Sequence, residues 1–410
     1  MDIFKSELEP HQLTAKAIND KSLLSEMLLM LSKQIRDKDK HWDGCFGAKP
    51  TSNIAWNGGW DPNSRVLVSL LLSIGLANDA WPKDVKDLIA ESARYAIQSE
   101  IRLNRIPITY TNVAISLAAS CFYLGRYFDD EEMFKYGRNL IDSVTNDRLI
   151  RGGFHEFGSP TYLGLSLLAA SFAEQINHEK IKLVDLLSSD LDYSWDSKLC
   201  DFVGPAMRSY GPSVHSHYSL SLLAINPFKT LKSYNPKNHL SDQSFKDIFT
   251  MISPFDQGRV SKNESTNTKI SGVATLTLNS VLEPVRLGGA NFTQGAWHHQ
   301  AVSASIHSDR GALILRHPSI STKVSECTIQ WQKVDTNQNG FPKWLWGSLP
   351  LPTNKNKLRI GNINTQGWNI SLLDSTHIKV GSAILLSSSP VFVSGDSFNL
   401  NANEGSLTLI

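Results

Sequence analysis

Apolar residues in the first 250 positions recur at the three- and four-residue spacing of amphipathic helices. The spacing predicts helices over residues 23–31, 66–74, 85–96, 112–124, 131–144, 162–175, 181–191 and 214–223. Residues 114–119 are apolar around a wide arc, which indicates a helix packed on more than one side. Helices of this length joined by short loops are typical of antiparallel helical hairpins. No strict repeat is evident, so a regular solenoid is not supported, whereas a toroid of hairpins that have diverged in sequence stays open.

The pattern changes after about residue 255, where short β-rich runs follow one another. These runs are residues 272–278, 301–305, 312–316, 327–331, 368–372, 377–380, 383–386 and 391–393. Turn residues separate them, which predicts an antiparallel sandwich or barrel. Pro227, Pro236 and Pro254 interrupt the helical pattern before the change. We therefore predict an α+β chain of two domains: an incomplete (α/α) toroid, the catalytic domain, over residues 1–250, and an antiparallel β-sandwich over 251–410.

Charge and hydropathy narrow the expected partners and location. The 410 residues include 40 basic and 39 acidic side chains, with a net charge of +1 and no basic block. Nucleic acid and membrane surfaces are therefore not expected partners, and no apolar run is long enough to span a bilayer. The first residues lack the pattern of a secretion signal. We expect a cytoplasmic protein, or a secreted or periplasmic one if a leader has been removed.

The cysteines add a further constraint. Cys45, Cys121, Cys200 and Cys327 are far apart and form no CxxC pair. This argues against a structural zinc site and against a disulfide framework, and favours a reducing compartment. No metal and no cofactor is expected.

The stretch from residue 152 to 162 carries the strongest candidate chemistry. His155, Glu156 and Tyr162 lie in a turn rich in glycine and proline that opens an apolar helix. Ser159 is placed to cap that helix, and Pro160 suits its first turn. Backbone donors at a helix N-terminus favour an anion. The structural alternative is a capped loop with a buried histidine that has satisfied partners.

Two further loops precede predicted helices. Trp56, Asn57 and Trp60 surround a Gly-Gly turn and suit a platform for stacking a sugar, or a hydrophobic staple ahead of the next helix. Tyr110 and Asn112 come directly before the helix at 112–124. Asn112 is either its N-cap or an amide aimed into a cavity at the helix mouth.

A fourth loop, residues 208–218, again precedes a predicted helix. It contains Arg208, Tyr210, His215, His217 and Tyr218. The two histidines would share one side of an extended segment, but no third ligand with metal-site spacing accompanies them. This loop therefore predicts a binding or catalytic segment and no metal site.

Together the four loops supply Asn, His, Tyr and Arg and no obvious pair of carboxylates. Removing a proton beside a carboxylate needs that carboxylate neutralised, a base, and an acid near the leaving oxygen. Most glycosidases need two carboxyl groups instead. For that chemistry only Glu156 and Asp61 are candidates.

The architecture and motifs resemble the toroid-type polysaccharide lyases, which include the alginate lyase and heparinase II/III-like groups. The similar segments are Tyr110-Thr-Asn112, Gly153 to Tyr162 and Arg208-Ser-Tyr210. The resemblance implies β-elimination of a uronic-acid-containing oligo- or polysaccharide without a redox cofactor. It also implies roles: Asn112 and Arg208 neutralise the uronate, His155 is the base, and Tyr162 or Tyr210 is the acid. Glu156 is expected to orient His155 or a tyrosine. Trp56, Asn57, Trp60, Tyr110, His215 and Tyr218 are the expected substrate-binding residues.

Three alternatives stay open. An inverting glycoside hydrolase would use Glu156 with Asp61. Apolar residues such as Trp56, Trp60 and Phe157 would also suit elimination or cyclisation of a non-sugar metabolite. A glycan-binding protein without turnover would use the same loops for affinity alone.

Overall fold

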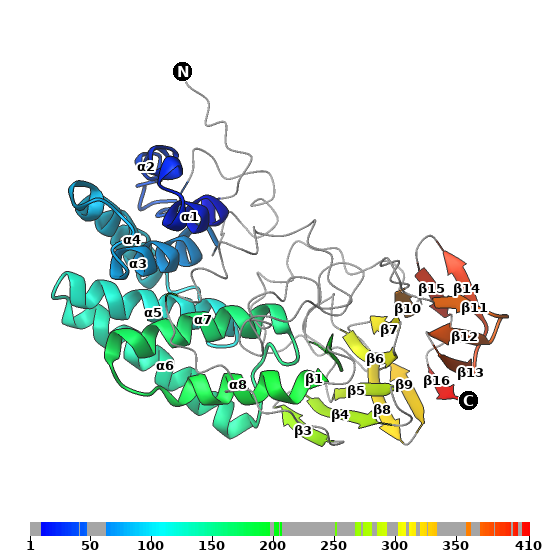
Figure 1. Cartoon of the computed structure of the whole chain (residues 1–410). Coiled ribbons are helices and arrows are strands. Elements are labelled where there is room, and N and C mark those ends of the chain that lie inside the picture. The colour runs from blue at the N-terminus through cyan, green and yellow to red at the C-terminus, as the bar shows by residue number, and fades with distance from the viewer. Residues whose placement is uncertain are drawn as a thin grey trace.

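A computed structural model describes the helical half of the chain almost continuously and the sheet half strand by strand (Figure 1). The described residues are 10–40, 42–46, 63–196, 201–204, 206, 251, 267–271, 274–280, 285–292, 302–308, 311–316, 320–325, 327–333, 358–361, 370–380, 382–394, 397–400 and 404–410.

The helical region follows the predicted apolar periodicity. Its elements are α1 (Pro10–Asn19), η1 (Lys21–Leu23), α2 (Leu24–Ser32), η3 (Asn63–Leu67), α3 (Val68–Ala77), α4 (Lys83–Leu103), α5 (Thr111–Tyr127), α6 (Glu131–Arg151), α7 (Pro160–Asn177) and α8 (Lys182–Ser194). Consecutive helices pack as hairpins, α3 with α4, α5 with α6 and α7 with α8. The predicted helix at 214–223 lies outside the described residues, and α1 was not predicted.

Helix α5 is the centre of this region. It packs against α3, α6 and α7, and residues from Thr111 to Gly125 are buried around nearly its whole circumference. Gly137 of α6 allows the close approach, because a Cβ there would lie 2.8 Å from the carbonyl oxygen of Ala118. The prediction of a helix packed on several sides is confirmed.

The sheet region is antiparallel throughout the part that the structure describes. Its strands are β3 (Asn267–Ser271), β4 (Ala274–Ser280), β5 (Arg286–Phe292), β6 (Val302–Ser308), β7 (Gly311–Arg316), β8 (Ile320–Ser325), β9 (Thr328–Lys333), β10 (Leu358–Gly361), β11 (Ile370–Leu372), β12 (His377–Val380), β13 (Ala383–Ser387), β14 (Val391–Ser394), β15 (Ser397–Leu400) and β16 (Glu404–Leu409). The predicted runs correspond to β4, β6, β7, β9 and β11–β14, whereas β3, β5, β8, β10, β15 and β16 were missed.

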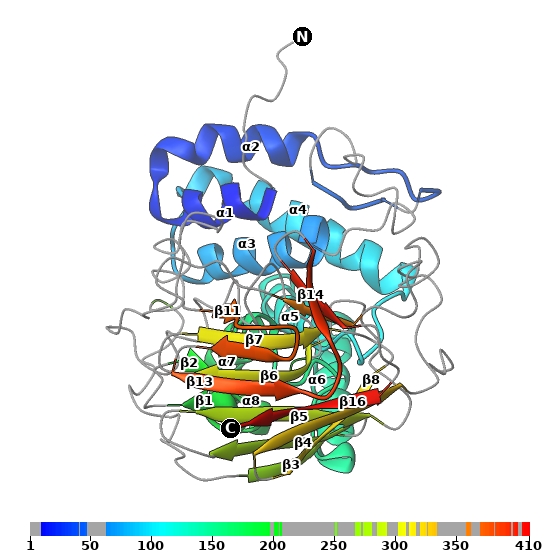
Figure 2. The same cartoon turned by 90° about the vertical axis from the view of Figure 1, so that its right-hand side faces the viewer.

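These strands form two sheets. One has the order β14-β15-β10-β7-β6-β5-β4-β3, and the other the order β11-β12-β13-β16-β9-β8. A second apolar core lies between them and includes Leu287, Ile306, Ile329, Ile378 and Leu407. In Figure 2 the six-stranded sheet faces the viewer, α5–α8 lie behind the eight-stranded sheet, and α1–α4 lie above the sheets. The chain is therefore helices followed by an antiparallel sandwich, as predicted; the division at residue 250 stays a prediction.

A short hairpin joins the helical region to the eight-stranded sheet. After α8, β1 (Trp195–Asp196) pairs with β2 (Asp201–Phe202). The carboxylate of Asp196 accepts a hydrogen bond from Nε of Arg286 in β5, and both side chains are about nine-tenths buried. The backbone N–H of Gly204 donates to Oγ of Ser305 in β6 at 3.1 Å. The two regions thus share buried polar contacts.

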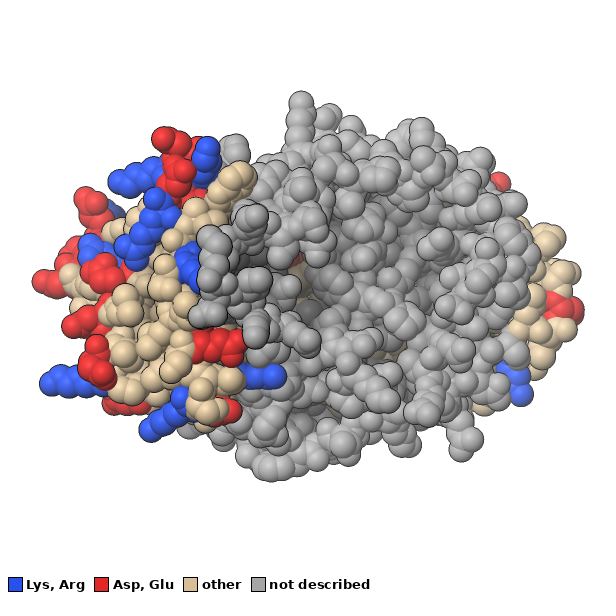
Figure 3. Space-filling model, turned by 90° about the horizontal axis from the view of Figure 1, so that it is seen from above, with Lys and Arg blue, Asp and Glu red and all other residues tan. Residues whose placement is uncertain are grey.

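The described surface mixes charges of both signs. In Figure 3, Lys and Arg alternate with Asp and Glu over the helical end of the molecule. Among the described helices, none is both long and apolar enough to span a membrane. Cys45, Cys121 and Cys327 are free thiols, and Cys200 lies outside the described residues.

Candidate active site

The central candidate loop begins where α6 ends. Gly152 is the C-cap of α6, with a φ of 76°, and its N–H donates to the carbonyl oxygen of Arg148 at 2.9 Å. This left-handed conformation costs glycine little and reverses the chain after the last turn. The reversal carries residues 153–159 across the mouth of α5 to the start of α7.

Glu156 binds the N-terminus of α5. One carboxylate oxygen accepts the backbone N–H of Asn112 at 2.7 Å, and the other accepts the side-chain amide of Asn112, also at 2.7 Å. Both residues are buried, with 1% and 3% of their surfaces exposed. A carboxylate at this position satisfies a free helix amide and interacts favourably with the positive end of the helix dipole. The predicted segments around Asn112 and Glu156 therefore meet.

Two cap assignments from the sequence need correction. Tyr110, not Asn112, is the N-cap residue of α5, and its side chain makes no capping hydrogen bond. The backbone N–H of Asn112 is bound instead by Glu156, which is distant in sequence. Ser159 has the extended backbone of an N-cap of α7, but its side chain makes no capping hydrogen bond. Pro160 stands at the first turn of α7, as predicted.

His155 is buried beside Asp147 of α6. Its Nε2 lies 3.1 Å from Oδ2 of Asp147, whose other oxygen accepts Nε of Arg151 at 2.7 Å. Burial lowers the pKa of His155 below its usual value; the Asp147 charge acts to raise it, and the Arg151 charge acts to lower it. Burial thus favours the neutral imidazole, whose Nε2 lies next to the Asp147 carboxylate.

Both tyrosines of these segments lie at helix mouths. Tyr162 is in the first turn of α7 and is 7% exposed, whereas Tyr110 is half-buried at the start of α5. The structure therefore brings five of the predicted site residues to neighbouring helix termini. They are Tyr110, Asn112, His155, Glu156 and Tyr162.

The other predicted site residues lie outside the described residues. They are Trp56, Asn57, Trp60, Arg208, Tyr210, His215 and Tyr218, together with Asp61 of the hydrolase alternative. For these the expectations from the sequence stand as predictions.

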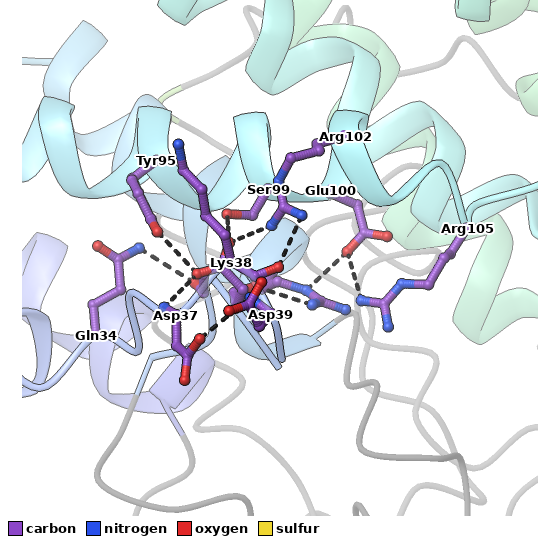
Figure 4. A network of polar contacts seen from close by, with 12 residues as sticks. Gln34, Asp37, Lys38, Asp39, Tyr95, Ser99, Glu100, Arg102 and Arg105 are labelled. Atoms are coloured by element: carbon purple, nitrogen blue, oxygen red, sulfur yellow. Dashed lines mark hydrogen bonds and ion pairs between the residues drawn. The ribbon is translucent and has the colours of Figure 1, made fainter. Parts of the chain in front are cut away.

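A buried polar network fixes the chain ahead of the Trp56–Trp60 loop (Figure 4). At its centre, the carboxylate of Asp43 accepts hydrogen bonds from the hydroxyls of Tyr95 and Ser99, from Arg102 and from the backbone N–H of Asp37, at 2.6–2.9 Å. Burial acts to raise the pKa of Asp43, but these four hydrogen bonds outweigh it and hold that pKa below its usual value.

The same network fixes the chain after that loop. Arg65, which is fully buried, donates to the backbone oxygen of Asp43 at 3.2 Å and lies 2.8 Å from the carboxylate of Glu100. Arg105 lies 3.6 Å from the same carboxylate, and burial, aided by the Arg65 charge, lowers the pKa of Arg105 to about 10. Removing one member of such a buried set leaves an uncompensated charge. We infer a structural role for the network, next to the loop's two ends.

Asp147 and Asp43 are the residues that sequence reasoning missed. Asp147 stands four residues before Arg151 in the last turn of α6, a spacing that indicates only a surface ion pair. Its contact with His155 depends on the chain reversal at Gly152. No group of three or more His, Cys, Asp or Glu side chains suited to a metal occurs in the described part of the chain.

Comparison with solved structures shows that this fold is similar to that of heparinase III. Over 100% of this chain and 79% of the other, the structure is similar to a crystal structure of heparinase III, with a TM-score of 0.53 and 9% sequence identity. At this identity the likeness shows the fold alone, a helical region followed by an antiparallel sheet region.

The chain belongs to the family described as "Domain of unknown function (DUF8769)", whose match covers residues 26–254. That match contains every described site residue. The search of curated proteins gave no match.

Proposed function

We propose that this protein is a carbon–oxygen lyase that cleaves a uronic-acid-containing oligo- or polysaccharide by β-elimination. The observation that carries the proposal is the buried His155 next to the partly exposed Asp147, in the segment whose Glu156 contacts Asn112 at the mouth of α5. The lyase-like fold supports the reaction class.

His155 is the base. In the tautomer with the proton on Nε2, the nitrogen that lies 3.1 Å from Asp147, the lone pair is on Nδ1, and that nitrogen takes the proton from the carbon next to the uronate carboxylate. Because burial lowers its pKa, the imidazole is neutral and able to accept the proton at neutral pH. Asp147 stabilises the imidazolium that forms, as a carboxylate does beside a catalytic histidine.

The helix mouth and Arg208 neutralise the substrate carboxylate. An asparagine amide carries two N–H groups, and Glu156 accepts one of them from Asn112. The second serves the uronate, whose charge grows as the proton leaves. Glu156 is then a positioning residue that fixes Asn112.

Tyr162 donates the proton to the leaving oxygen, with Tyr210 as the other candidate. The electron pair left by the removed proton forms the new carbon–carbon double bond as the carbon–oxygen bond breaks. Trp56, Asn57, Trp60, Tyr110, His215 and Tyr218 bind neighbouring sugar units.

The test is an ultraviolet-absorbance assay of the full chain against heparan sulfate, hyaluronan, chondroitin, alginate and polygalacturonate. We expect absorbance from the unsaturated uronate with at least one of them. His155→Ala should abolish the signal and Tyr162→Phe should reduce it, while His178→Asn, a change at the exposed C-cap of α7, should not.

Silence across the panel would overturn the proposal, as would full activity in His155→Ala. Release of reducing ends without an unsaturated product would indicate hydrolysis instead. In the structure both oxygens of Glu156 accept hydrogen bonds from Asn112, which fits a helix cap better than a proton donor. Loss of hydrolysis in Glu156→Gln would nevertheless favour the hydrolase.

A further inference from the structure

The outer face of the six-stranded sheet carries an ordered array of polar side chains. β8, β9 and β16 are neighbours, and their register aligns two rows of three residues across the strands. One row is Ser321, Gln332 and Glu404; the other is Lys323, Gln330 and Ser406. Neighbours in a row are about 4.8 Å apart, and the rows are about 6.6 Å apart. In Figure 2 this sheet faces the viewer, on the side away from the helices.

These residues line a groove of about 620 Å³. Ligand sites in proteins are roughly 300 to 1,000 Å³. Ser388, which follows β13, contributes another hydroxyl to the lining and is held in place by two contacts with Ser406: its Oγ accepts the backbone N–H of Ser406 at 2.8 Å, and its own N–H donates to the carbonyl oxygen of Ser406 at 3.0 Å. The groove therefore has a size and a fixed polar lining suited to a ligand.

The layer beneath the rows is rigid. Trp331 is 3% exposed, and its indole packs over Gly405, where a Cβ would overlap the ring. Both residues also contribute to the lining of the groove. The indole N–H of Trp331 has no hydrogen-bond partner among the described residues. Trp331 belongs to the apolar core between the sheets, on the face of β9 opposite Gln330 and Gln332, so its side chain supports the floor of the groove from below.

We propose that this groove is a second, non-catalytic binding site for an oligosaccharide chain, recognised through its hydroxyl groups. The proposal rests on the lining of the groove and is independent of the function proposed for the helical region. A glycan bound there would tether a polymer to the sheet region while another part of it is processed elsewhere.

The lining chemistry favours a polyhydroxylated ligand. Gln330, Gln332 and the serines each offer a donor and an acceptor, as sugar hydroxyls do. Lys323 and Glu404 carry opposite charges, so the groove has no net preference for an anion. Among the described residues that line it, the only aromatic one is Trp331, which is buried, so this lining does not offer the apolar wall that an amphipathic helix needs.

Calorimetry of the full chain with a neutral glucose hexamer, cellohexaose, tests the proposal, since this probe contains no uronate to eliminate. We expect binding, and at least about a tenfold loss of affinity in the double variant Gln330→Ala/Gln332→Ala, which removes two hydrogen-bonding amides. Hydrogen exchange should show protection by the hexamer at residues 328–333 and 404–409.

Gln98→Ala is the matched control, because Gln98 is an exposed glutamine on α4. It should leave the affinity unchanged. All of these glutamines are on the surface, so neither variant should unfold the chain. No binding by the unmodified protein, equal affinity in the double variant, or protection confined to the helices would each overturn the proposal.

Discussion

Two buried histidines, one in each region, have similar neighbours and different settings. His155 lies beside Asp147, which pairs with Arg151, and His307 of β6 lies near Asp196, which pairs with Arg286. The partners differ in exposure: the side chains of Asp147 and Arg151 are 19% and 40% exposed, those of Asp196 and Arg286 about 10%. The Asp147–Arg151 pair beside His155 reaches solvent, so a proton can be exchanged there. The Asp196–Arg286 pair near His307 is enclosed where the two regions meet.

The pKa shifts separate the two settings further. Burial lowers the pKa of His307 to about 4, against which the Asp196 charge acts only in part. For His155 burial is opposed by both the charge and the contact of Asp147. The comparison teaches that the accessibility of the partner, more than the residue types, distinguishes a candidate base from a structural histidine.

The largest expected difference between the two histidines is in turnover. His155→Gln should lower kcat about 10²- to 10⁴-fold, the usual contribution of general base catalysis, and His307→Gln should leave kcat within about twofold. Initial rates at neutral pH with the substrate identified by the absorbance screen measure both. Equal losses in the two variants would contradict the distinction.

The next largest effect is a difference in the free energy of unfolding between variants of Arg286 and Arg151. Arg286→Met removes the opposite charge from the buried Asp196 carboxylate and should cost about 3–5 kcal/mol. Arg151→Met removes a partly exposed pair and should cost at most about 1 kcal/mol. Denaturant unfolding of both variants gives the comparison, and similar midpoints would show that the junction pair is not the stronger one.

Stability should also depend on pH through His307. The folded chain keeps this imidazole neutral down to about pH 4, while the unfolded chain protonates it below about 6.5. Between these pH values the unfolded state binds more protons than the folded state. The neutral His307 therefore contributes about 3 kcal/mol to the free energy of unfolding above pH 6.5, and this contribution is lost as the pH falls to 4. Unfolding free energies from pH 4 to 7 should show this slope, and His307→Gln should flatten it. An unchanged slope in His307→Gln would mean that a group other than His307 causes the pH dependence.

The smallest expected effect is a shift in the pH–rate profile. The Asp147 charge acts to raise the pKa of His155, so Asp147→Asn should lower that pKa further. The acid limb of kcat/KM should then move to lower pH, with a smaller loss of plateau rate than in His155→Gln. A limb that moves to higher pH would contradict the assignment of His155 as the base.

The sequence predicted the helices well because each buries a long apolar stripe. Helix α5 and its wide apolar arc could be read directly from residues 114–119. Strands such as β5 were missed because two central glycines, Gly288 and Gly289, weaken the alternating pattern. β16 begins with Glu404 and Gly405 and has few apolar residues, so its pairing with β9 and β13 is a tertiary effect.

The candidate site was predicted in part. The loop around His155 stood out through its residue types and the Ser-Pro-Thr helix start. The partners of its side chains could not be read, since Asn112 and Glu156 are 44 positions apart and meet only after α5 and α6 have packed. The contact of Asp147 with His155 likewise depends on the left-handed turn at Gly152.

The hydrogen bond from the backbone N–H of Asn112 to Glu156 means that the exchange of this amide proton reports on opening of the 152–158 segment. That amide is in the first turn of α5, where helix bonding alone would leave it unprotected, so its exchange with solvent has to await release by the 152–158 segment. Slow exchange at this single position would record the opening frequency of the loop in the unmodified protein, without any label at the site. Ligand binding that holds the loop closed would slow it further.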